Sequence, residues 1–117
     1  MPKVLLAEDD QTMVALLKTL LNMEGYRVAA LDADADIVDS VLKEAPDILV
    51  MDVHLLRLNG IEELTRLRAA PGGSAVRVVM TSGLDFKDVC LSRGADVFIQ
   101  KPFMPDELLG AMKKLVA

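Results

Sequence analysis

The sequence predicts an α/β fold, a doubly wound parallel sheet of five strands flanked by five helices. Five short apolar runs recur along the chain, and each is followed by a segment with the apolar spacing of a helix. Short connections that contain Gly, Pro, Asp or Asn separate these segments. Strands that alternate with helices over short connections run parallel and are joined by right-handed crossovers. Because 117 residues is a common size for one domain, we expect residues 1–117 to form a single domain.

The first half of the chain predicts two strand–helix units and a third strand. Residues 4–7 are apolar at every position, as expected of a strand buried on both faces. Residues 13–23 have helical spacing, and Gly25 is a suitable helix stop. Residues 26–31 are mixed in polarity, which favours a strand at the sheet edge. The second helix carries Ile37, Val38, Val41 and Leu42 and ends before Pro46, and a third strand at residues 48–51 leads into Asp52.

The second half predicts three helices and two more strands. A loop through Asn59 and Gly60 precedes a helix that carries Ile61, Leu64 and Leu67. The fourth strand covers residues 76–81, a short helix follows at about residues 85–92, and residues 97–99 form the fifth strand. The last helix starts at Pro105, with acidic residues in its first turn and basic residues in its last turn: Asp106, Glu107, Lys113 and Lys114.

Composition excludes several classes of protein. A formal net charge of −5 argues against a nucleic-acid surface, which needs clustered Lys and Arg. No apolar run approaches the roughly 20 residues that span a bilayer, so we expect no membrane contact. The single cysteine, Cys90, has no internal disulfide partner, which is typical of a reducing compartment. We therefore expect a cytoplasmic protein that makes no direct contact with nucleic acid.

Charged or hydroxyl side chains stand at the carboxyl ends of four of the five predicted strands. Glu8 and Asp9 follow the first strand, Asp52 ends the third, Ser82 follows the fourth, and Lys101 follows the fifth. In an open parallel sheet, binding sites form outside the carboxyl ends of the strands, at the point where the strand order reverses. These five side chains are therefore the candidate functional residues.

The chemistry of these residues favours phosphoryl transfer to a carboxylate. Carboxylates that converge in one cleft repel each other unless a cation joins them, and oxygen ligands suit Mg²⁺. Lys101 supplies a point charge for a phosphoryl oxygen, and Ser82 supplies a hydrogen-bond donor. A carboxylate can act as a covalent nucleophile and form an aspartyl phosphate. Asp52 is the best nucleophile because it ends a central strand, and its choice over Glu8 or Asp9 rests on topology.

Four motifs resemble the receiver domain of bacterial two-component response regulators over essentially the whole chain. They are LLAEDD at residues 5–10, DILVMD at 47–52, VMTSG at 79–83 and GADVFIQKPF at 94–103, with Gly60 eight residues after Asp52. The resemblance implies a flavodoxin-like receiver fold with strand order 2-1-3-4-5. It also implies a Mg²⁺-dependent reaction in which a histidine kinase or a histidine phosphotransfer protein phosphorylates Asp52 and thereby switches a partner-binding face.

The resemblance assigns a role to each matching residue. Glu8 and Asp9 correspond to the acidic pair that binds the metal with Asp52, and the backbone carbonyl of His54 is a further Mg²⁺ ligand. Lys101 corresponds to the phosphate-binding lysine and Ser82 to the switch hydroxyl. Two further features follow from the same resemblance: a cis peptide bond between Lys101 and Pro102, and an aromatic switch residue at Phe98, for which a plain core role is equally open.

Three departures from the family pattern leave parts of this interpretation open. Leu56 stands where the family usually has proline, so the loop after Asp52 is expected to be more mobile. Thr81 adjoins Ser82, and a one-residue shift would exchange the switch role between them. The stretch from Ser82 to Gly94 is shorter than is common, which truncates the fourth helix. This helix usually belongs to the face that contacts downstream partners, so its truncation leaves the identity of the downstream protein open. A homodimer that forms on phosphorylation is one option.

Simpler interpretations exist beside the functional one. Asp10 is best explained as a helix N-cap, and the His54 side chain as an exposed loop residue without chemistry. A pseudo-receiver, which binds a partner without phosphorylation, is the first alternative. A nucleotide or flavin binder of similar fold is the second, and the acids after the first strand, in place of a Gly-rich loop, argue against it. The receiver interpretation describes a signalling phosphoacceptor rather than an enzyme, either standing alone or as part of a longer protein.

Overall fold

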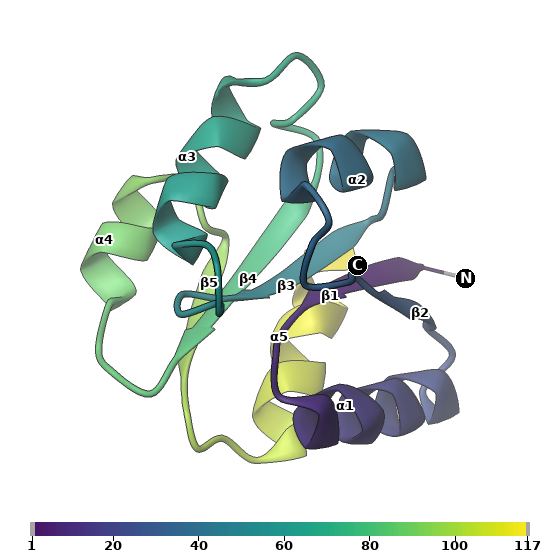
Figure 1. The fold of residues 1–117 in the computed structure, drawn as a ribbon. Coiled ribbons are helices and arrows are strands. Elements are labelled where there is room, and N and C mark those ends of the chain that lie inside the picture. Colours follow the sequence, from purple (N-terminus) through teal and green to yellow (C-terminus); the bar gives the residue numbers. More distant parts are fainter. Residues whose placement is uncertain (1, 117) are drawn as a thin grey trace.

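Five parallel strands form the central sheet in the order β2-β1-β3-β4-β5 (Figure 1), so the predicted fold class and strand order are confirmed. The computed structural model describes residues 2–116, and the first and last residues of the expected domain lie outside that range. The strands are β1 (Lys3–Ala7), β2 (Arg27–Ala30), β3 (Ile48–Asp52), β4 (Arg77–Ser82) and β5 (Val97–Gln100). The helices are α1 (Gln11–Met23), α2 (Ile37–Glu44), α3 (Gly60–Ala69), α4 (Lys87–Ser92) and α5 (Pro105–Val116).

The helices cover both faces of the sheet. Figure 1 shows α1 and α5 on one face and α2, α3 and α4 on the other. Successive residues of a strand point to opposite faces, so β1, β3 and β4 supply apolar side chains to both layers. On the α1/α5 face the fully buried residues include Leu6, Leu21 and Met112, and on the opposite face they include Leu5, Leu64 and Met80.

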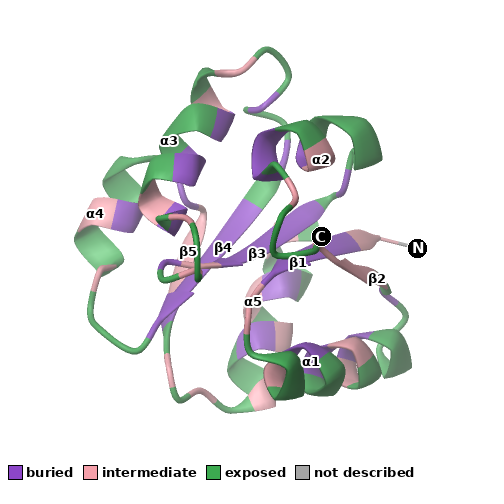
Figure 2. Ribbon diagram, in the orientation of Figure 1, coloured by how far each residue is buried: buried purple, intermediate pink, exposed green. Residues whose placement is uncertain are grey.

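The sheet is buried in its centre and more exposed at its edge, as the sequence predicted. Figure 2 shows buried β1, β3 and β4 between the two helix layers. The edge strand β2 is only partly buried along its length. Its mixed polarity therefore reflects a real difference in environment.

Local capping explains where the first helix begins. The Asp10 carboxylate accepts hydrogen bonds from the backbone N–H groups of Thr12 (3.0 Å) and Met13 (3.1 Å). These bonds satisfy two donors that a helix start leaves unpaired. The helix consequently starts at Gln11, two residues before the first apolar residue of the predicted pattern. The N-cap interpretation of Asp10 is confirmed.

The fourth helix is short, as the spacing between Ser82 and Gly94 predicted. It has six residues, and Phe86 occupies its N-cap position without a side-chain capping bond. Cys90 is the buried residue of this helix and packs into the core. With so few residues, α4 is held mainly by packing rather than by its own hydrogen bonds.

Arg68 ties α3 to the segments that lead into β4 and β5. Its guanidinium donates to the backbone carbonyl oxygens of Gly94 (2.8 and 2.9 Å), Gly73 (2.9 Å) and Val76 (2.7 Å). It also lies 3.2 Å from a carboxylate oxygen of Asp96. A planar guanidinium carries five donors in a fixed geometry, which suits this set of acceptors.

Replacing Arg68 with methionine is expected to lower the free energy of unfolding by about 2–4 kcal/mol, because several partly buried acceptors lose their donor. Urea unfolding followed by circular dichroism measures this change. Arg93→Met is the matched control, because Arg93 makes an exposed side-chain hydrogen bond to Thr65 (3.0 Å). That control is expected to cost no more than about 0.5 kcal/mol. Equal effects of the two substitutions would contradict a special role for Arg68.

Candidate functional site

The candidate site lies at the carboxyl edge of the sheet, where the ends of β1, β3, β4 and β5 meet. Asp52 is the last residue of β3 and Ser82 the last of β4, while Glu8 and Lys101 directly follow β1 and β5. Parallel pairing places Asp52 opposite Thr81 on the neighbouring strand. Each predicted residue therefore reaches this edge through the end of its own strand.

Lys101 joins two of the predicted carboxylates. Its Nζ atom lies 2.6 Å from Oε1 of Glu8 and 2.9 Å from Oδ2 of Asp52. The side chains of Lys101, Glu8 and Asp52 are only 23%, 8% and 13% exposed. The peptide bond from Lys101 to Pro102 is cis, as the family resemblance implied. Lys101 is 93 positions from Glu8 and 49 positions from Asp52 in the sequence, and the three side chains form one partly buried ionic cluster.

Burial raises the pKa of the Glu8 carboxyl to about 7, because removal from water penalises the charged form. The hydrogen bond from Lys101 opposes this shift, and the nearby Asp52 carboxylate adds to it. Burial alone would lower the pKa of Lys101, but its ion pairs with Glu8 and Asp52 raise that pKa above its ordinary value. Glu8 thus ionises less readily than an exposed carboxyl, and a cation bound beside it would favour its charged form.

Asp9 has a different partner from the other two acids. Its carboxylate accepts a hydrogen bond from the backbone N–H of Leu56, in the loop between β3 and α3. Across residues 2–116, no three His, Cys, Asp or Glu side chains are arranged to hold a metal ion together. The oxygen donors of Glu8, Asp9 and Asp52 fit Mg²⁺ by their chemistry. In the present arrangement, however, they are engaged by Lys101 and by Leu56.

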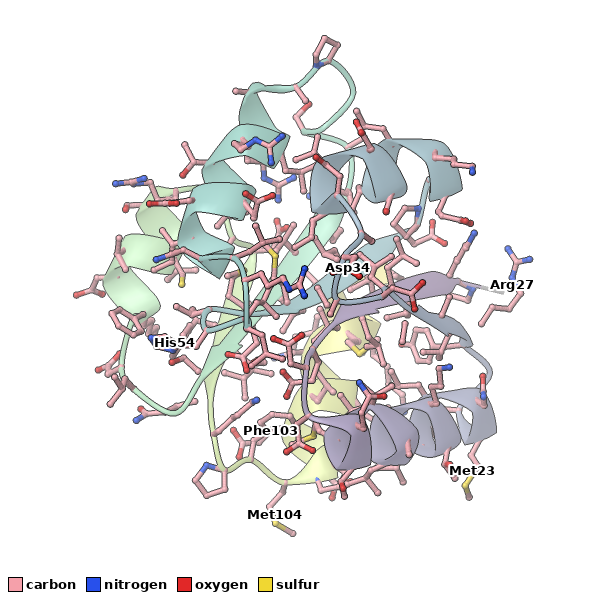
Figure 3. All side chains as sticks on the ribbon, viewed as in Figure 1. Met23, Arg27, Asp34, His54, Phe103 and Met104 are labelled. Carbon is pink, nitrogen blue, oxygen red and sulfur yellow. The ribbon has the colours of Figure 1, made fainter. Side chains whose placement is uncertain are left out.

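His54 contacts Asp52 through its backbone and not through its ring. Its N–H donates to Oδ1 of Asp52 (3.2 Å), whereas its imidazole packs against Phe86 with the ring centroids 5.6 Å apart. Figure 3 shows His54 on the α4 side of the molecule, well separated from Phe103. The side chain is exposed, in agreement with its interpretation as a passive loop residue.

Ser82 and Thr81 leave β4 on opposite faces of the sheet. Ser82 is fully buried, and its Oγ accepts a hydrogen bond from the Leu84 N–H (3.1 Å). It shares a face with Met80, which pairs with Phe98 on β5, and Phe98 is partly buried against that core. Thr81 shares a face with its neighbour Asp52. Thr81 therefore lies beside Asp52 and lines a small cavity with Asp52 and Lys101, whereas Ser82 lies on the Phe98 face.

Gly60 allows the loop after Asp52 to close tightly. A Cβ atom at this position would lie 2.2 Å from the backbone oxygen of Asp52 and 2.9 Å from the Cα atom of Val53. The Gly60 N–H donates to the Val53 carbonyl (2.7 Å), which closes the loop at the start of α3. Any side chain here would have to displace the backbone that carries Asp52.

Sequence reasoning missed one group of the site, the backbone N–H of Leu56. Its existence could be read from the sequence, because any residue other than proline carries a backbone donor. Residue types alone give no indication of where such a donor points.

The structure also shows no helix in the described part of the chain that is long and apolar enough to cross a membrane.

Solved structures of receiver domains are similar to this chain over nearly its whole length. The receiver domain of Francisella response regulator 1452 has a TM-score of 0.88 and 29% sequence identity, with 98% of this chain and 96% of that chain covered. The receiver domain of sensor histidine kinase PA1611 from Pseudomonas aeruginosa has a TM-score of 0.84 and 26% identity, with 99% and 98% covered. That structure has a magnesium ion coordinated in its active-site cleft.

Sequence relatives give the same result. Transcriptional regulatory protein PrrA of Mycobacterium tuberculosis is 33% identical over 116 residues, which cover 98% of this chain and 50% of that protein. Response regulator MprA of Mycobacterium avium is 31% identical over 116 residues, with 97% and 50% covered. The chain thus spans about half the length of the curated relatives it matches. The family model described as the response regulator receiver domain matches residues 4–113, and the chain belongs to that family.

Proposed function

We propose that this receiver domain accepts a phosphoryl group on Asp52 from a histidine kinase or a histidine phosphotransfer protein, in a reaction that requires Mg²⁺. The observation that carries the proposal is the position of the Lys101 ammonium, 2.9 Å from Asp52 and 2.6 Å from Glu8 at the carboxyl edge of the sheet. A buried ion pair contributes little net stability, because desolvation offsets the attraction. A cation held against a strand-end carboxylate is better explained by phosphate chemistry.

In the proposed reaction, an Asp52 carboxylate oxygen forms a bond to phosphorus as the phosphorus–nitrogen bond of the donor phosphohistidine breaks. The imidazole leaves with the bonding electron pair and is neutralised by a proton. Lys101 then pairs with a phosphoryl oxygen in place of a carboxylate oxygen. Such a reaction needs mainly alignment and neutralisation of charge on the transferred group. The receiver is in this sense a phosphoacceptor that catalyses its own phosphorylation and dephosphorylation, and not an enzyme acting on a separate substrate.

Glu8, Asp9, Asp52 and the backbone carbonyl of His54 are the groups that would hold Mg²⁺. The bound ion would neutralise charge on the phosphoryl oxygens and favour the ionised carboxylates. Support comes from the oxygen-only donors and from the raised pKa of Glu8. The magnesium ion in the related receiver of sensor histidine kinase PA1611 is further support.

Ser82 is the proposed switch hydroxyl. The Ser82 Oγ accepts a hydrogen bond from the Leu84 N–H through a lone pair, so its own hydroxyl proton can be donated to a phosphoryl oxygen. Movement of Ser82 toward Asp52 would change the packing on the face that contains Phe98 and α4. This change in packing would shift an existing equilibrium between two conformations of the partner-binding face.

A comparison of Ser82→Ala with Thr81→Val tests this assignment. We expect both variants to be phosphorylated, but Ser82→Ala should lose the change in the NMR signals of the Phe98 ring that phosphorylation produces in the wild type. Thr81→Val should retain that change, because Thr81 lies on the other face of β4. The reverse pattern would assign the switch role to Thr81.

A pseudo-receiver is the second candidate function, and one observation favours it. The acidic side chains are engaged by Lys101 and by the Leu56 N–H, so the described residues do not present a preassembled metal site. In that case the domain would bind its partner without phosphorylation. The two functions differ in whether Asp52 becomes phosphorylated at all.

The wider role follows from the family. We propose that the domain acts in the cytoplasm and that its output is contact with a downstream protein, with a homodimer of phosphorylated chains as one form. Relatives such as PrrA are named as transcriptional regulators and are about twice as long. The domain itself has a formal charge of −5, so we propose no direct contact with nucleic acid.

Intact-protein mass spectrometry tests the proposed function. The protein is incubated with a small acyl phosphate as donor, once with Mg²⁺ and once with excess chelator. We expect the mass of one phosphoryl group to be added only when Mg²⁺ is present. Bound Mg²⁺ without any added phosphoryl group would support the pseudo-receiver instead.

A further inference from the structure

The loop between β3 and α3, residues 53–59, contacts the acidic pair through its backbone. The Leu56 N–H donates to the carboxylate of Asp9, 47 residues earlier in the sequence. The Leu56 side chain is 80% exposed, so packing does not hold this residue in place. A separate exposed ion pair, between Arg57 and Asp34 (2.6 Å), ties the same loop to the segment before α2. Asp34 is labelled in Figure 3.

We propose that the Leu56 backbone N–H is a positioning group that holds Asp9 toward this loop, so that Mg²⁺ binding must first open the hydrogen bond. The inference rests on the proposed function, in that it takes Asp9 as a metal ligand. A hydrogen bond from a neutral donor partly satisfies the negative charge that would otherwise attract the cation. The domain therefore binds Mg²⁺ less tightly than its carboxylates alone allow.

Three observations lead to this conclusion. Glu8 and Asp52 are joined by Lys101, whereas the described contact of the Asp9 carboxylate is with the loop. No cluster of three metal-binding side chains is assembled in the described range. The contact depends on a backbone donor, which proline would lack at this position. Residue 56 thus controls whether Asp9 has a competing partner.

Two substitutions separate the backbone donor from the side chain. Leu56→Pro removes the N–H that donates to Asp9. Leu56→Ala keeps the N–H and removes most of the exposed side chain. Neither variant changes an acidic residue or Lys101, so the proposed ligands themselves are intact.

Isothermal titration calorimetry with MgCl₂ measures the effect. We expect Leu56→Pro to lower the Kd for Mg²⁺ by about tenfold, because one hydrogen bond to a charged group is worth roughly that factor. Leu56→Ala is expected to stay within about twofold of the wild type, since surface side chains contribute little. An unchanged or higher Kd in Leu56→Pro would overturn the proposal.

A measurement on the wild type covers the case in which Leu56→Pro fails to fold. The NMR signal of the Leu56 amide should shift upfield, and its proton should exchange faster, as MgCl₂ is added. A signal that does not respond to saturating Mg²⁺ would overturn the proposal. Phosphorylation by a small acyl phosphate is measured separately. Tighter Mg²⁺ binding in Leu56→Pro without phosphorylation of either protein would support the positioning role and reject the proposed function.

Discussion

An Asp52→Asn variant is expected to take up no phosphoryl group from a small acyl phosphate under conditions that convert the wild type. Asparagine has nearly the same volume as aspartate but lacks the carboxylate nucleophile. Its side-chain oxygen can still accept the hydrogen bond that the His54 N–H donates to Asp52 (3.2 Å). The loss of phosphorylation should therefore be complete while the fold is kept. Intact-protein mass spectrometry measures phosphorylation, and thermal unfolding shows whether the fold is kept.

Asp47→Asn is the matched control for Asp52→Asn. Asp47 is exposed at the opposite end of β3, where its carboxylate accepts a hydrogen bond from the Lys3 N–H (2.8 Å). This variant makes the same chemical change far from the proposed chemistry, and we expect it to be phosphorylated like the wild type. Equal phosphorylation of Asp52→Asn and the wild type would mean that another residue is the acceptor.

A Lys101→Ala variant is expected to bind Mg²⁺ but to lose the structural response to phosphorylation. The ammonium group is no metal ligand, and its removal leaves the oxygen donors of Glu8 and Asp52 in place. The transferred phosphoryl group, however, loses the cation that would hold it. Removal of one preorganised electrostatic contact typically slows a reaction by about a hundredfold or more, so phosphorylation should also be slower. Calorimetry measures Mg²⁺ binding, and NMR spectra with and without the phosphodonor measure the response.

Lys113→Ala provides the control for the change in charge. Lys113 is exposed in the last turn of α5 and belongs to no ion pair described for the site. This variant should be phosphorylated and should respond like the wild type. If Lys101→Ala retained the full NMR response of the wild type, Lys101 would have no part in the switch.

The fold was predictable because the sequence is locally consistent. The apolar runs in β1 and β3 have a strand's length and no polar interruptions, and α1 shows helical spacing with a capping residue, Asp10. Boundaries differed by one or two residues in either direction: α1 starts two residues earlier because Asp10 caps it, whereas β2 is one residue shorter at each end. The strand order came from the family resemblance, since alternation alone leaves the order of parallel strands open.

For each residue of the site, the strand end that carries it could be predicted from the sequence. Parallel topology brings the ends of β1, β3, β4 and β5 to one edge, so the proximity of Glu8, Asp52 and Lys101 follows from their positions. The pairing of Lys101 with Glu8 as well as with Asp52 depends on side-chain reach, which residue type does not fix. The same holds for the Leu56 N–H and for the Arg68 network, because both involve backbone groups that carry no signature in the sequence.

Reduction of the phosphorylated protein with borohydride, followed by tandem mass spectrometry of its peptides, tests most directly whether Asp52 is the phosphoryl acceptor. Borohydride reduces an acyl phosphate to an alcohol and so marks the carboxyl group that carried phosphorus. We predict that the mark lies on Asp52 and that its formation requires Mg²⁺. A mark on Glu8 or Asp9, or no mark in protein that has bound Mg²⁺, would contradict the proposed chemistry.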